Sequence, residues 1–239
     1  MRTVLITGGA KRLGRALVEH FDRQGWRVLF TCRTSFEEGI ALADSLGKDV
    51  HCARSAVSTQ SSAAAVAKWV RTHTDRLDLI VCNASTFKRA GIAETTPDDF
   101  ADMLGSNLLG PFFLVQQCME LLKQTNGCVV NVADAQALGG VEKFTAYIAA
   151  KAALISITKS MAVELAPHIR VNAVLPGSLP WPETGDAYPP EVRENIVANI
   201  PMGEVGRWCD VVHTVAYLES ARYVTGACTT VDGGRAALF

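Results

Sequence analysis

A tyrosine and a lysine four residues apart are the residues of this chain best suited to proton chemistry. Tyr147 and Lys151 bracket the sequence YIAAK, and residues with this spacing share one face of a helix. An ammonium group beside a phenol favours the phenolate, so we expect Lys151 to lower the tyrosine pKa from about 10 toward the range useful for acid catalysis. Such pairs also arise by chance in helices, so their meaning depends on the motifs around them.

A glycine-rich turn close to the N-terminus has the context of a dinucleotide-binding site. The sequence TGGAKRLG at residues 7–14 joins a short apolar run to a segment with helical periodicity. Glycine lets the backbone approach a pyrophosphate, and the N-terminus of the following helix presents free N–H groups to it. Arg12 stands where the usual G-x-G-x-x-G pattern has a glycine, so a turn without a ligand is the alternative. The cofactor contacts expected here are Thr7, Gly8, Gly9, Lys11, Arg12, Leu13 and Gly14.

The end of the second apolar run indicates which dinucleotide would bind. NAD-binding units usually carry an acid there, which bonds the ribose 2′-hydroxyl. Residues 31–35 read TCRTS, without an acid. The guanidinium of Arg33 and the hydroxyls of Thr34 and Ser35 suit a 2′-phosphate, and Lys11 and Arg12 add positive charge. Solvated surface cations are the alternative, but the missing acid favours NADPH as cofactor.

Apolar runs that alternate with helical segments must position these residues. Strands are predicted at short apolar runs bounded by glycine or polar residues, and helices where apolar residues recur every three or four positions. The sequence of Thr96 and Pro97 is typical of a helix N-cap and first helical residue. The predicted strands are 4–7, 27–31, 50–53, 77–82, 128–132, 169–175 and 229–231. The predicted helices are 13–24, 36–46, 61–72, one long helix from 96 to about 123, 144–165, 190–200 and 210–218.

This alternation predicts an α/β fold. Continuous apolar strands separated by helices indicate a parallel sheet flanked by helices on both faces, and right-handed crossovers make it a doubly wound, Rossmann-type domain. No linker, repeat or low-complexity stretch divides the chain, so we expect a single domain over residues 1–239. The only long irregular segment, residues 177–188, is rich in proline and has the length of a lid or binding loop.

Composition argues against several functional classes. A net charge of −1 gives no reason to expect nucleic acid or an anionic membrane as partner, and no apolar stretch approaches the ~20 residues of a membrane span. The seven cysteines and five histidines lack metal-ligand spacing, so we expect no metal site. Buried thiols, and an N-terminus that enters a strand without the apolar core of a signal peptide, predict a cytoplasmic protein.

Further motifs occur in the order found in one enzyme family. The chain resembles the short-chain dehydrogenases/reductases over nearly its whole length, through TGG at 7–9 with Gly14, CNAS at 82–85, Asn107, Tyr147 with Lys151, PG at 176–177, and YVTG at 223–226 leading to VDGG at 231–234. By this resemblance Tyr147 is the proton donor, Lys151 tunes its pKa and holds the nicotinamide ribose, and Asn107 supports a proton-relay water. The resemblance also implies cofactor contacts at Asn83, Ala84, Ser85, Tyr147, Lys151, Pro176, Gly177 and Ser178.

Two departures from the family pattern narrow the substrate. The family's usual Asn-Asn-Ala-Gly reads CNAS at 82–85, and its catalytic serine, about thirteen residues before the tyrosine, falls on Asp134. The aspartate, with GAKRLG at 9–14 and NASTF at 83–87, resembles the pteridine reductases and the related dihydromonapterin reductases. In those enzymes an aromatic ring stacks a flat pterin against the nicotinamide. The substrate contacts implied are Arg12, Ser85, Phe87, Asp134 and Tyr147, with Trp181 closing the pocket.

The chemistry of a carboxyl group suits a pterin, whose planar ring carries donors and acceptors on its edge. Asp134 near Tyr147 can relay a proton to a ring nitrogen while hydride arrives at carbon. Each assignment has an alternative: Asp134 as an Asx-turn residue, and Phe87 and Trp181 as packing residues. Residues 53–58 also lack the acid that many relatives place near the adenine, so an adenine contact is missing or is supplied by backbone.

Three functions remain open. The preferred one is an NADPH-dependent reductase of a dihydropterin such as dihydromonapterin, dihydrobiopterin or dihydrofolate. The second is reduction of a carbonyl such as a 3-oxoacyl thioester, although a neutral hydroxyl serves a carbonyl oxygen better than an ionised Asp134. The third is a non-catalytic NADPH-binding sensor, which would not need Tyr147. By analogy with relatives that pack two long helices against a neighbour, we expect a homotetramer joined through helices 96–123 and 144–165.

Overall fold

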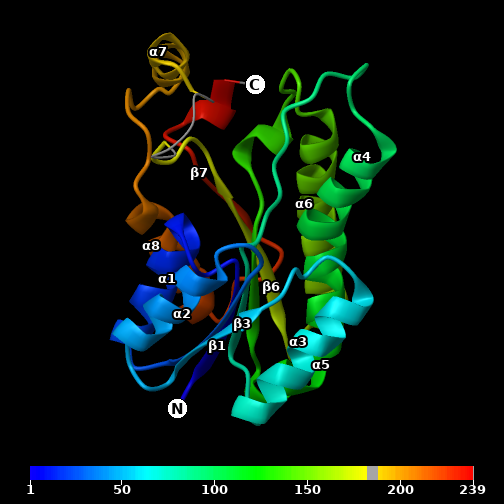
Figure 1. Ribbon diagram of the computed structural model, residues 1–239, viewed down its shortest axis with the longest axis vertical. Coiled ribbons are helices and arrows are strands. Elements are labelled where there is room, and N and C mark those ends of the chain that lie inside the picture. Colours follow the sequence, from blue (N-terminus) through cyan, green and yellow to red (C-terminus); the bar gives the residue numbers. More distant parts are fainter. Residues whose placement is uncertain (182–187, 239) are drawn as a thin grey trace.

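Figure 1 shows the computed structural model of the chain, which describes residues 1–181 and 188–238. Seven parallel strands form one sheet in the order β3-β2-β1-β4-β5-β6-β7. The direction of winding reverses between β1 and β4, and ligands of open α/β sheets bind outside the carboxyl ends of the strands at such a point. The strands are β1 (Thr3–Thr7), β2 (Arg27–Cys32), β3 (Val50–Arg54), β4 (Leu79–Cys82), β5 (Cys128–Val132), β6 (Arg170–Pro176) and β7 (Cys228–Val231).

Helices cover both faces of the sheet, which confirms the predicted doubly wound α/β fold (Figure 1). One face carries α1 (Arg12–Arg23), α2 (Phe36–Ser45) and α8 (Trp208–Ser220). The other carries α3 (Gln60–His73), α5 (Gly110–Thr125) and α6 (Thr145–Leu165). The remaining helical segments are α4 (Pro97–Leu104), the π-helical turn η1 (Gly105–Leu109), α7 (Pro190–Ala198), and the 3-10 turns η2 (Ala135–Leu138) and η3 (Arg235–Leu238).

Strands β1, β2, β4, β5 and β6 are mostly apolar because each contributes to a core on either face of the sheet. Val4 and Ile6 of β1 belong to the core shared with α1, α2 and α8. Leu5, between them, belongs to the core shared with α3 and α5. All five residues of β1 are buried. A strand covered on both faces therefore shows no alternation of polar and apolar residues, which is why its sequence predicts a parallel sheet.

The long helix predicted from residue 96 to about 123 is helical without a gap from Pro97 to Thr125, but it contains a π-helical turn that the sequence did not predict, η1, between α4 and α5. Asn107 lies in this turn, and its Nδ2 donates to the carbonyl oxygen of Met103 at 3.0 Å. Pro111, in the first turn of α5, has no N–H to donate to the preceding turn. A side chain that bonds a helical carbonyl, together with proline, widens the helix locally. The apolar periodicity continues through the turn, so the sequence does not reveal it.

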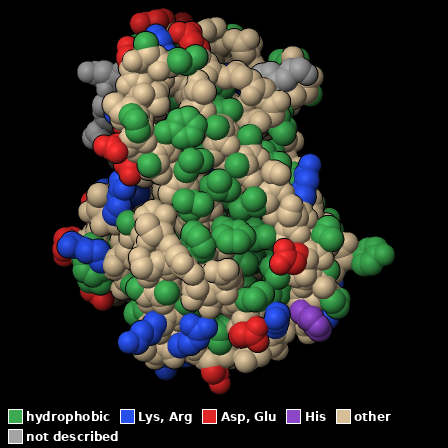
Figure 2. Space-filling model, turned by 90° about the vertical axis from the view of Figure 1, so that its right-hand side faces the viewer, with side chains coloured by type: hydrophobic (Ala, Val, Ile, Leu, Met, Phe, Trp, Pro, Cys, Tyr) green, Lys and Arg blue, Asp and Glu red, His purple; other side chains and the backbone are tan. Residues whose placement is uncertain are grey.

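Helix α6 is long and apolar enough to cross a membrane by composition alone, contrary to the expectation that no segment would be. Half of its apolar window is buried, and α6 packs against β6 and α4. A helix that forms part of a protein core meets the same criterion, so one such helix is weak evidence of a membrane span. Figure 2 shows the face of the molecule that includes α4, η1, α5 and α6, where hydrophobic side chains gather in the middle. The exposed ones on these elements include Phe100, Leu109, Phe112 and Val163.

Candidate functional site

A cleft of about 1100 Å³ opens at the carboxyl ends of strands β1 to β6. All residues expected to bind substrate line it, namely Arg12, Ser85, Phe87, Asp134, Tyr147 and Trp181. Most of the expected cofactor contacts also line it: Gly8, Lys11, Arg12, Leu13, Gly14, Arg33, Thr34, Ser35, Asn83, Ala84, Ser85, Tyr147, Lys151, Pro176, Gly177 and Ser178. The other three expected residues do not line the cleft but contact residues next to it or in its wall: Thr7, Gly9 and Asn107.

The glycine turn has the close backbone approach that its sequence indicates. Gly8 adopts a φ of +70°, and a Cβ on Gly14 would lie 1.9 Å from the Gly8 carbonyl oxygen. Arg12 adopts a φ of 51°, a left-handed conformation that glycine reaches without cost. Arginine therefore occupies the position where the usual motif has glycine and keeps that backbone conformation. Strain of this kind is retained where the surrounding structure or a function requires it.

Thr7 and Asn83 join the ends of β1 and β4 at the floor of the cleft. The Oγ1 of Thr7 accepts hydrogen bonds from the backbone N–H groups of Asn83, at 3.0 Å, and Ala84, at 2.9 Å. The Nδ2 of Asn83 donates to the carbonyl oxygens of Thr7 and Gly8, both at 3.0 Å. Gly9 donates to the Thr31 carbonyl at 2.9 Å. These bonds hold the turn open toward the cleft, so Thr7 and Gly9 shape the site from behind.

The end of β2 presents groups that suit an anion. Arg33 is exposed and makes no salt bridge with a described residue. Ser35 is the N-cap residue of α2, yet its hydroxyl makes no capping bond. Together with the helix N-terminus and the glycine turn, these groups fit a phosphorylated dinucleotide. The residues present are therefore compatible with the cofactor class that the sequence predicts.

Asp134, Tyr147 and Lys151 meet inside the cleft between the end of β5 and the start of α6. The Tyr147 hydroxyl donates to Asp134 Oδ2 at 2.8 Å. Asp134 Oδ1 accepts from the backbone N–H of Gln136 at 2.8 Å. Lys151 Nζ donates to the Val132 carbonyl oxygen at 2.8 Å. The two interpretations of Asp134 therefore coexist, because one carboxyl oxygen caps the turn η2 and the other contacts the tyrosine.

Burial sets the protonation of these groups. Burial, the nearby Asp134 carboxylate and the hydrogen bond to it raise the pKa of Tyr147 well above 10. Burial also raises the pKa of Asp134, although its hydrogen bonds oppose the rise. For Lys151, burial lowers the pKa to about 8, and the charge of Asp134 opposes this change. Burial thus shifts the pKa values of both Tyr147 and Asp134 upward, in the direction that suits donation of a proton to a substrate.

The expected lowering of the Tyr147 pKa by Lys151 is therefore not what the free chain shows. The Lys151 ammonium lies 5.7 Å from the centroid of the tyrosine ring and donates to a backbone carbonyl instead. The hydroxyl of Tyr147 faces a carboxylate, and a nearby negative charge disfavours the phenolate. The sequence showed the helical spacing of the pair but not the partner that each side chain takes.

Asn107 links the loop after β4 to the π-helical turn. It is fully buried, its Nδ2 donates to the Thr86 carbonyl oxygen at 3.0 Å, and its Oδ1 accepts from the Ser85 hydroxyl at 2.7 Å. A hydrogen bond of the Ser85 side chain also lowers the pKa of Tyr147 somewhat, against the larger effects that raise it. The amide of Asn107 therefore positions Ser85, which lies next to the tyrosine.

Aromatic rings form the outer wall of the cleft. Phe87 is 54% exposed; its ring stacks on Phe144, with centroids 4.7 Å apart, and meets Tyr147 edge-on at 5.2 Å. Trp181 lies 5.3 Å from the ring of Tyr188. The predicted loop at 177–188 also includes residues 182–187, which lie outside the described residues. A flat apolar surface next to the Asp134–Tyr147 pair suits a planar heterocyclic ligand.

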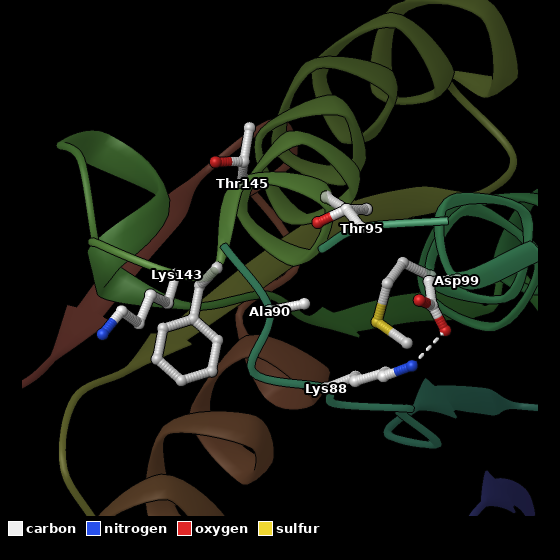
Figure 3. A pocket seen from close by; sticks show the side chains of 9 residues that line it. Lys88, Ala90, Thr95, Asp99, Lys143 and Thr145 are labelled. Carbon is white, nitrogen blue, oxygen red and sulfur yellow. Dashed lines mark hydrogen bonds and ion pairs between the residues drawn. The ribbon is translucent and has the colours of Figure 1, made fainter. Parts of the chain in front are cut away.

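A second, small cavity lies beside the cleft, and the residues around it anchor the loop that carries Phe87 (Figure 3). Its volume is about 10 Å³, which is room for about one water molecule. Lys88 and Asp99 form an ion pair of 2.6 Å at its edge, and the Ala90 N–H donates to the Lys143 carbonyl oxygen at 2.9 Å. The loop is thereby fastened to α4 and to the segment before α6, so Phe87 is held on the cleft wall.

Several lining residues were not identified from the sequence. Arg235 of η3 lines the cleft, donates to the Ser178 hydroxyl at 3.3 Å, and its positive charge slightly lowers the pKa of Asp134. Val192 and Ile196 bring α7 to the same wall. Their spacing of four is a helical signal, but nothing in the sequence shows which face of α7 meets the cleft. Arg235 follows the VDGG motif and belongs to no motif of its own.

Comparison with known proteins agrees with this architecture. A family model described as enoyl-(acyl carrier protein) reductase matches residues 8–236. A 3-oxoacyl-acyl-carrier-protein reductase of Staphylococcus aureus is 30% identical over 240 residues, covering 98% of this chain and 97% of the relative. A dihydromonapterin reductase of Klebsiella pneumoniae is 32% identical over 243 residues, covering 98% of this chain and 96% of the relative.

A solved structure supports the fold independently. The apo form of a SCOR enzyme from Clostridium thermocellum superposes with a TM-score of 0.89 and covers 99% of this chain and 93% of its own, at 24% sequence identity. Such a likeness shows the fold alone, whereas the family model and the relatives at or above 30% identity cover nearly the whole chain. The chain therefore belongs to the short-chain dehydrogenase/reductase family and is an oxidoreductase of that family.

Proposed function

We propose that this protein is an NADPH-dependent reductase that acts on a dihydropterin. The observation that carries the proposal is the 2.8 Å hydrogen bond from Tyr147 to the carboxyl group of Asp134 inside the cleft. Reduction of a ring C=N bond needs hydride at carbon and a proton at nitrogen. A buried acid and a phenol whose pKa values are both raised are suited to deliver that proton.

Each residue has a defined part in this chemistry. When bound, NADPH supplies the hydride. Tyr147 donates the proton, and Asp134, which shares its hydrogen bond, passes a proton back to the phenolate that remains. Lys151 places an ammonium group at the base of the cleft, where it would hold the nicotinamide ribose. If the ribose replaces the Val132 carbonyl as the hydrogen-bond partner of Lys151, the ammonium group would favour proton release from Tyr147. Asn107 keeps Ser85 beside the tyrosine and would support the proton-relay water.

The residues that line the cleft fit the pterin and the NADPH of the proposal. Phe87 offers a flat surface on which a pterin would stack, and Arg12 and Ser85 would bond its edge. Trp181 would close the pocket. Lys11, Arg33, Thr34 and Ser35 suit the 2′-phosphate that distinguishes NADPH from NADH.

Reduction of a 3-oxoacyl thioester is the second candidate, because one of the relatives at 30% identity has that activity in its name. A carbonyl oxygen that becomes negative is best stabilised by a neutral donor. Asp134 stands where the family usually has a serine hydroxyl, and both of its oxygens accept hydrogen bonds, one from the Tyr147 hydroxyl and one from the Gln136 N–H. The dihydropterin is therefore preferred, in line with the relative named as a dihydromonapterin reductase.

The proposal is tested by measuring NADPH oxidation with a panel of dihydropterins, dihydrofolate, 3-oxoacyl thioesters and simple ketones. Turnover of at least one dihydropterin with a kcat/KM above that for the thioesters and ketones is expected. Good turnover of a thioester without any pterin would overturn it. The Tyr147→Phe variant should bind NADPH normally and lose turnover, whereas retention of cellular function by that variant would favour a non-catalytic NADPH sensor.

We also propose that residues 1–239 form a single NADP(H)-binding domain and that the protein is a cytoplasmic homotetramer. The exposed apolar side chains on α4, η1, α5 and α6 support association (Figure 2). An apolar face of this kind is usual where copies of a chain meet. The continuity of one sheet through the chain supports a single domain.

A further inference from the structure

A salt bridge crosses the part of the cleft where anion-binding groups gather. Lys11 Nζ, beside the first turn of α1, lies 2.8 Å from Glu38 Oε1 in the first turn of α2. Helices α1 and α2 cover the same face of the sheet (Figure 1), and Arg33 and Ser35, between β2 and α2, line the cleft with Lys11. A carboxylate thus pairs with one of the cations that would hold a 2′-phosphate.

The cations of this region differ in their partners. Glu38 pairs with Lys11, and its neighbour Glu37 lies 3.6 Å from Arg54 at the end of β3. Arg33 makes no salt bridge with a described residue. Among the described residues, therefore, no carboxylate shares the charge of Arg33, whereas the charge of Lys11 is already partly satisfied.

Exposure makes the Lys11–Glu38 pair easy to exchange. The two side chains are 57% and 54% exposed, and water screens pairs of this kind strongly. A phosphate group carries more negative charge and more acceptor oxygens than a carboxylate, so it would displace Glu38 from the lysine. The displaced carboxylate would stay close to the phosphate and repel it. Both effects lower the affinity for a ligand that carries a 2′-phosphate.

We propose that Glu38 is a specificity-determining residue, which competes with the 2′-phosphate of NADPH for Lys11 and so limits the preference for NADPH over NADH. The inference rests on the proposed function, since it supposes that the 2′-phosphate lies at the end of β2. NADPH and NADH differ only in this phosphate. The ratio of their two dissociation constants therefore isolates what Glu38 does to the phosphate from any effect on the rest of the cofactor.

The test is a fluorescence titration of NADPH and NADH binding to wild type and to Glu38→Gln, without substrate. Removal of the carboxylate is expected to tighten NADPH binding about three- to tenfold and to leave NADH binding unchanged. Glutamine keeps the shape of the side chain, and circular dichroism checks that α2 still forms. Glu120→Gln is the matched control, because Glu120 pairs with Lys123 on α5 at 3.0 Å; both affinities should stay at the wild-type values.

A second variant shows whether Lys11 carries the effect. In a Lys11→Gln background, Glu38→Gln should tighten NADPH binding by no more than about twofold, because only repulsion remains to be relieved. Unchanged NADPH affinity in Glu38→Gln, equal tightening of both cofactors, or a full gain without Lys11 would overturn the inference. A wild type that binds NADH more tightly than NADPH would instead contradict the cofactor in the proposed function.

Discussion

At the scale of single residues, the site depends on three buried titratable groups whose pKa values burial moves in opposite directions. Burial favours the neutral form of each: the protonated forms of Asp134 and Tyr147 and the deprotonated form of Lys151. Keeping Lys151 charged in this position therefore lowers the stability of the folded protein, and packing does not compensate for the loss. Such a cost is common at functional sites.

Replacing Lys151 by methionine should therefore stabilise the protein while abolishing activity. A pKa lowered from 10.5 to about 8 corresponds to about 3 kcal/mol at pH 7, of which the lost hydrogen bond to Val132 offsets about 1 kcal/mol. The penalty in the wild type is full below pH 8 and fades as the pH rises toward 10.5. Urea unfolding should show Lys151→Met more stable at pH 7, by an amount that shrinks toward pH 10.

Lys159→Met is the control for this change, because Lys159 lies on the same helix and is exposed. Its stability should match the wild type at both pH values. A Lys151→Met variant that is less stable at pH 7 would show that burial of the ammonium group has little cost.

The charge of Asp134 should also set the alkaline limit of activity. This carboxylate raises the pKa values of both Tyr147 and Lys151. Its removal in Asp134→Ser lowers both, so the fall in kcat at high pH should move to lower pH by about one unit, whichever group is responsible. Asp134→Asn, which also lacks the charge, should give the same shift. Profiles of kcat against pH that coincide for all three proteins would exclude this electrostatic role.

At the scale of elements, the glycine turn and the ends of the strands form the cofactor side of the cleft. Much of this could be predicted, because continuous apolar strands and glycine spacing are local signals. The π-helical turn at Asn107 could not, since it depends on a side-chain bond to Met103 and not on periodicity. The contribution of α7 and Arg235 to the cleft arises from tertiary placement, which a single sequence does not encode locally.

The turn itself is tested by Gly14→Ala. A Cβ at Gly14 would lie 1.9 Å from the Gly8 carbonyl oxygen and 2.8 Å from Asn83 Nδ2, so the turn must move. We expect NADPH affinity to fall at least ~5-fold, since crowding of this kind costs about 1–3 kcal/mol. Gly140→Ala, where a Cβ would meet nothing within 4 Å, should bind NADPH as the wild type does. Equal affinity of the two variants would exclude the turn from the cofactor site.

At the scale of the whole molecule, the two halves of the sheet place the cofactor turn and the acid–phenol pair around one cleft, while α4 to α6 present an apolar outer face (Figure 2). The two halves of the sheet and their order along the chain could be predicted from the sequence, because each motif follows a predicted strand. It could not show that Val163, on that outer face, is 83% exposed, since a helix apolar on several sides reads as buried.

The apolar face predicts how the tetramer should respond to charge. Phe112→Glu combined with Val163→Glu places two carboxylates on the face and should dissociate the proposed tetramer to smaller species in size-exclusion chromatography with light scattering. Ala41→Glu, on the exposed side of α2, should leave the tetramer intact. A wild type that is monomeric, or a double variant that stays tetrameric, would place the interface elsewhere or exclude it.

If the Asp134–Tyr147 pair serves the reduction of a dihydropterin, deuterium from labelled NADPH should be transferred to that substrate. The protein is incubated with NADPH deuterated at the nicotinamide carbon that gives up hydride, together with equal amounts of a dihydropterin and a 3-oxoacyl thioester. Mass spectrometry then shows which product carries the label. A tetrahydropterin heavier by one deuterium is expected. Label found only in the 3-hydroxyacyl thioester, with the dihydropterin recovered unchanged, would contradict it.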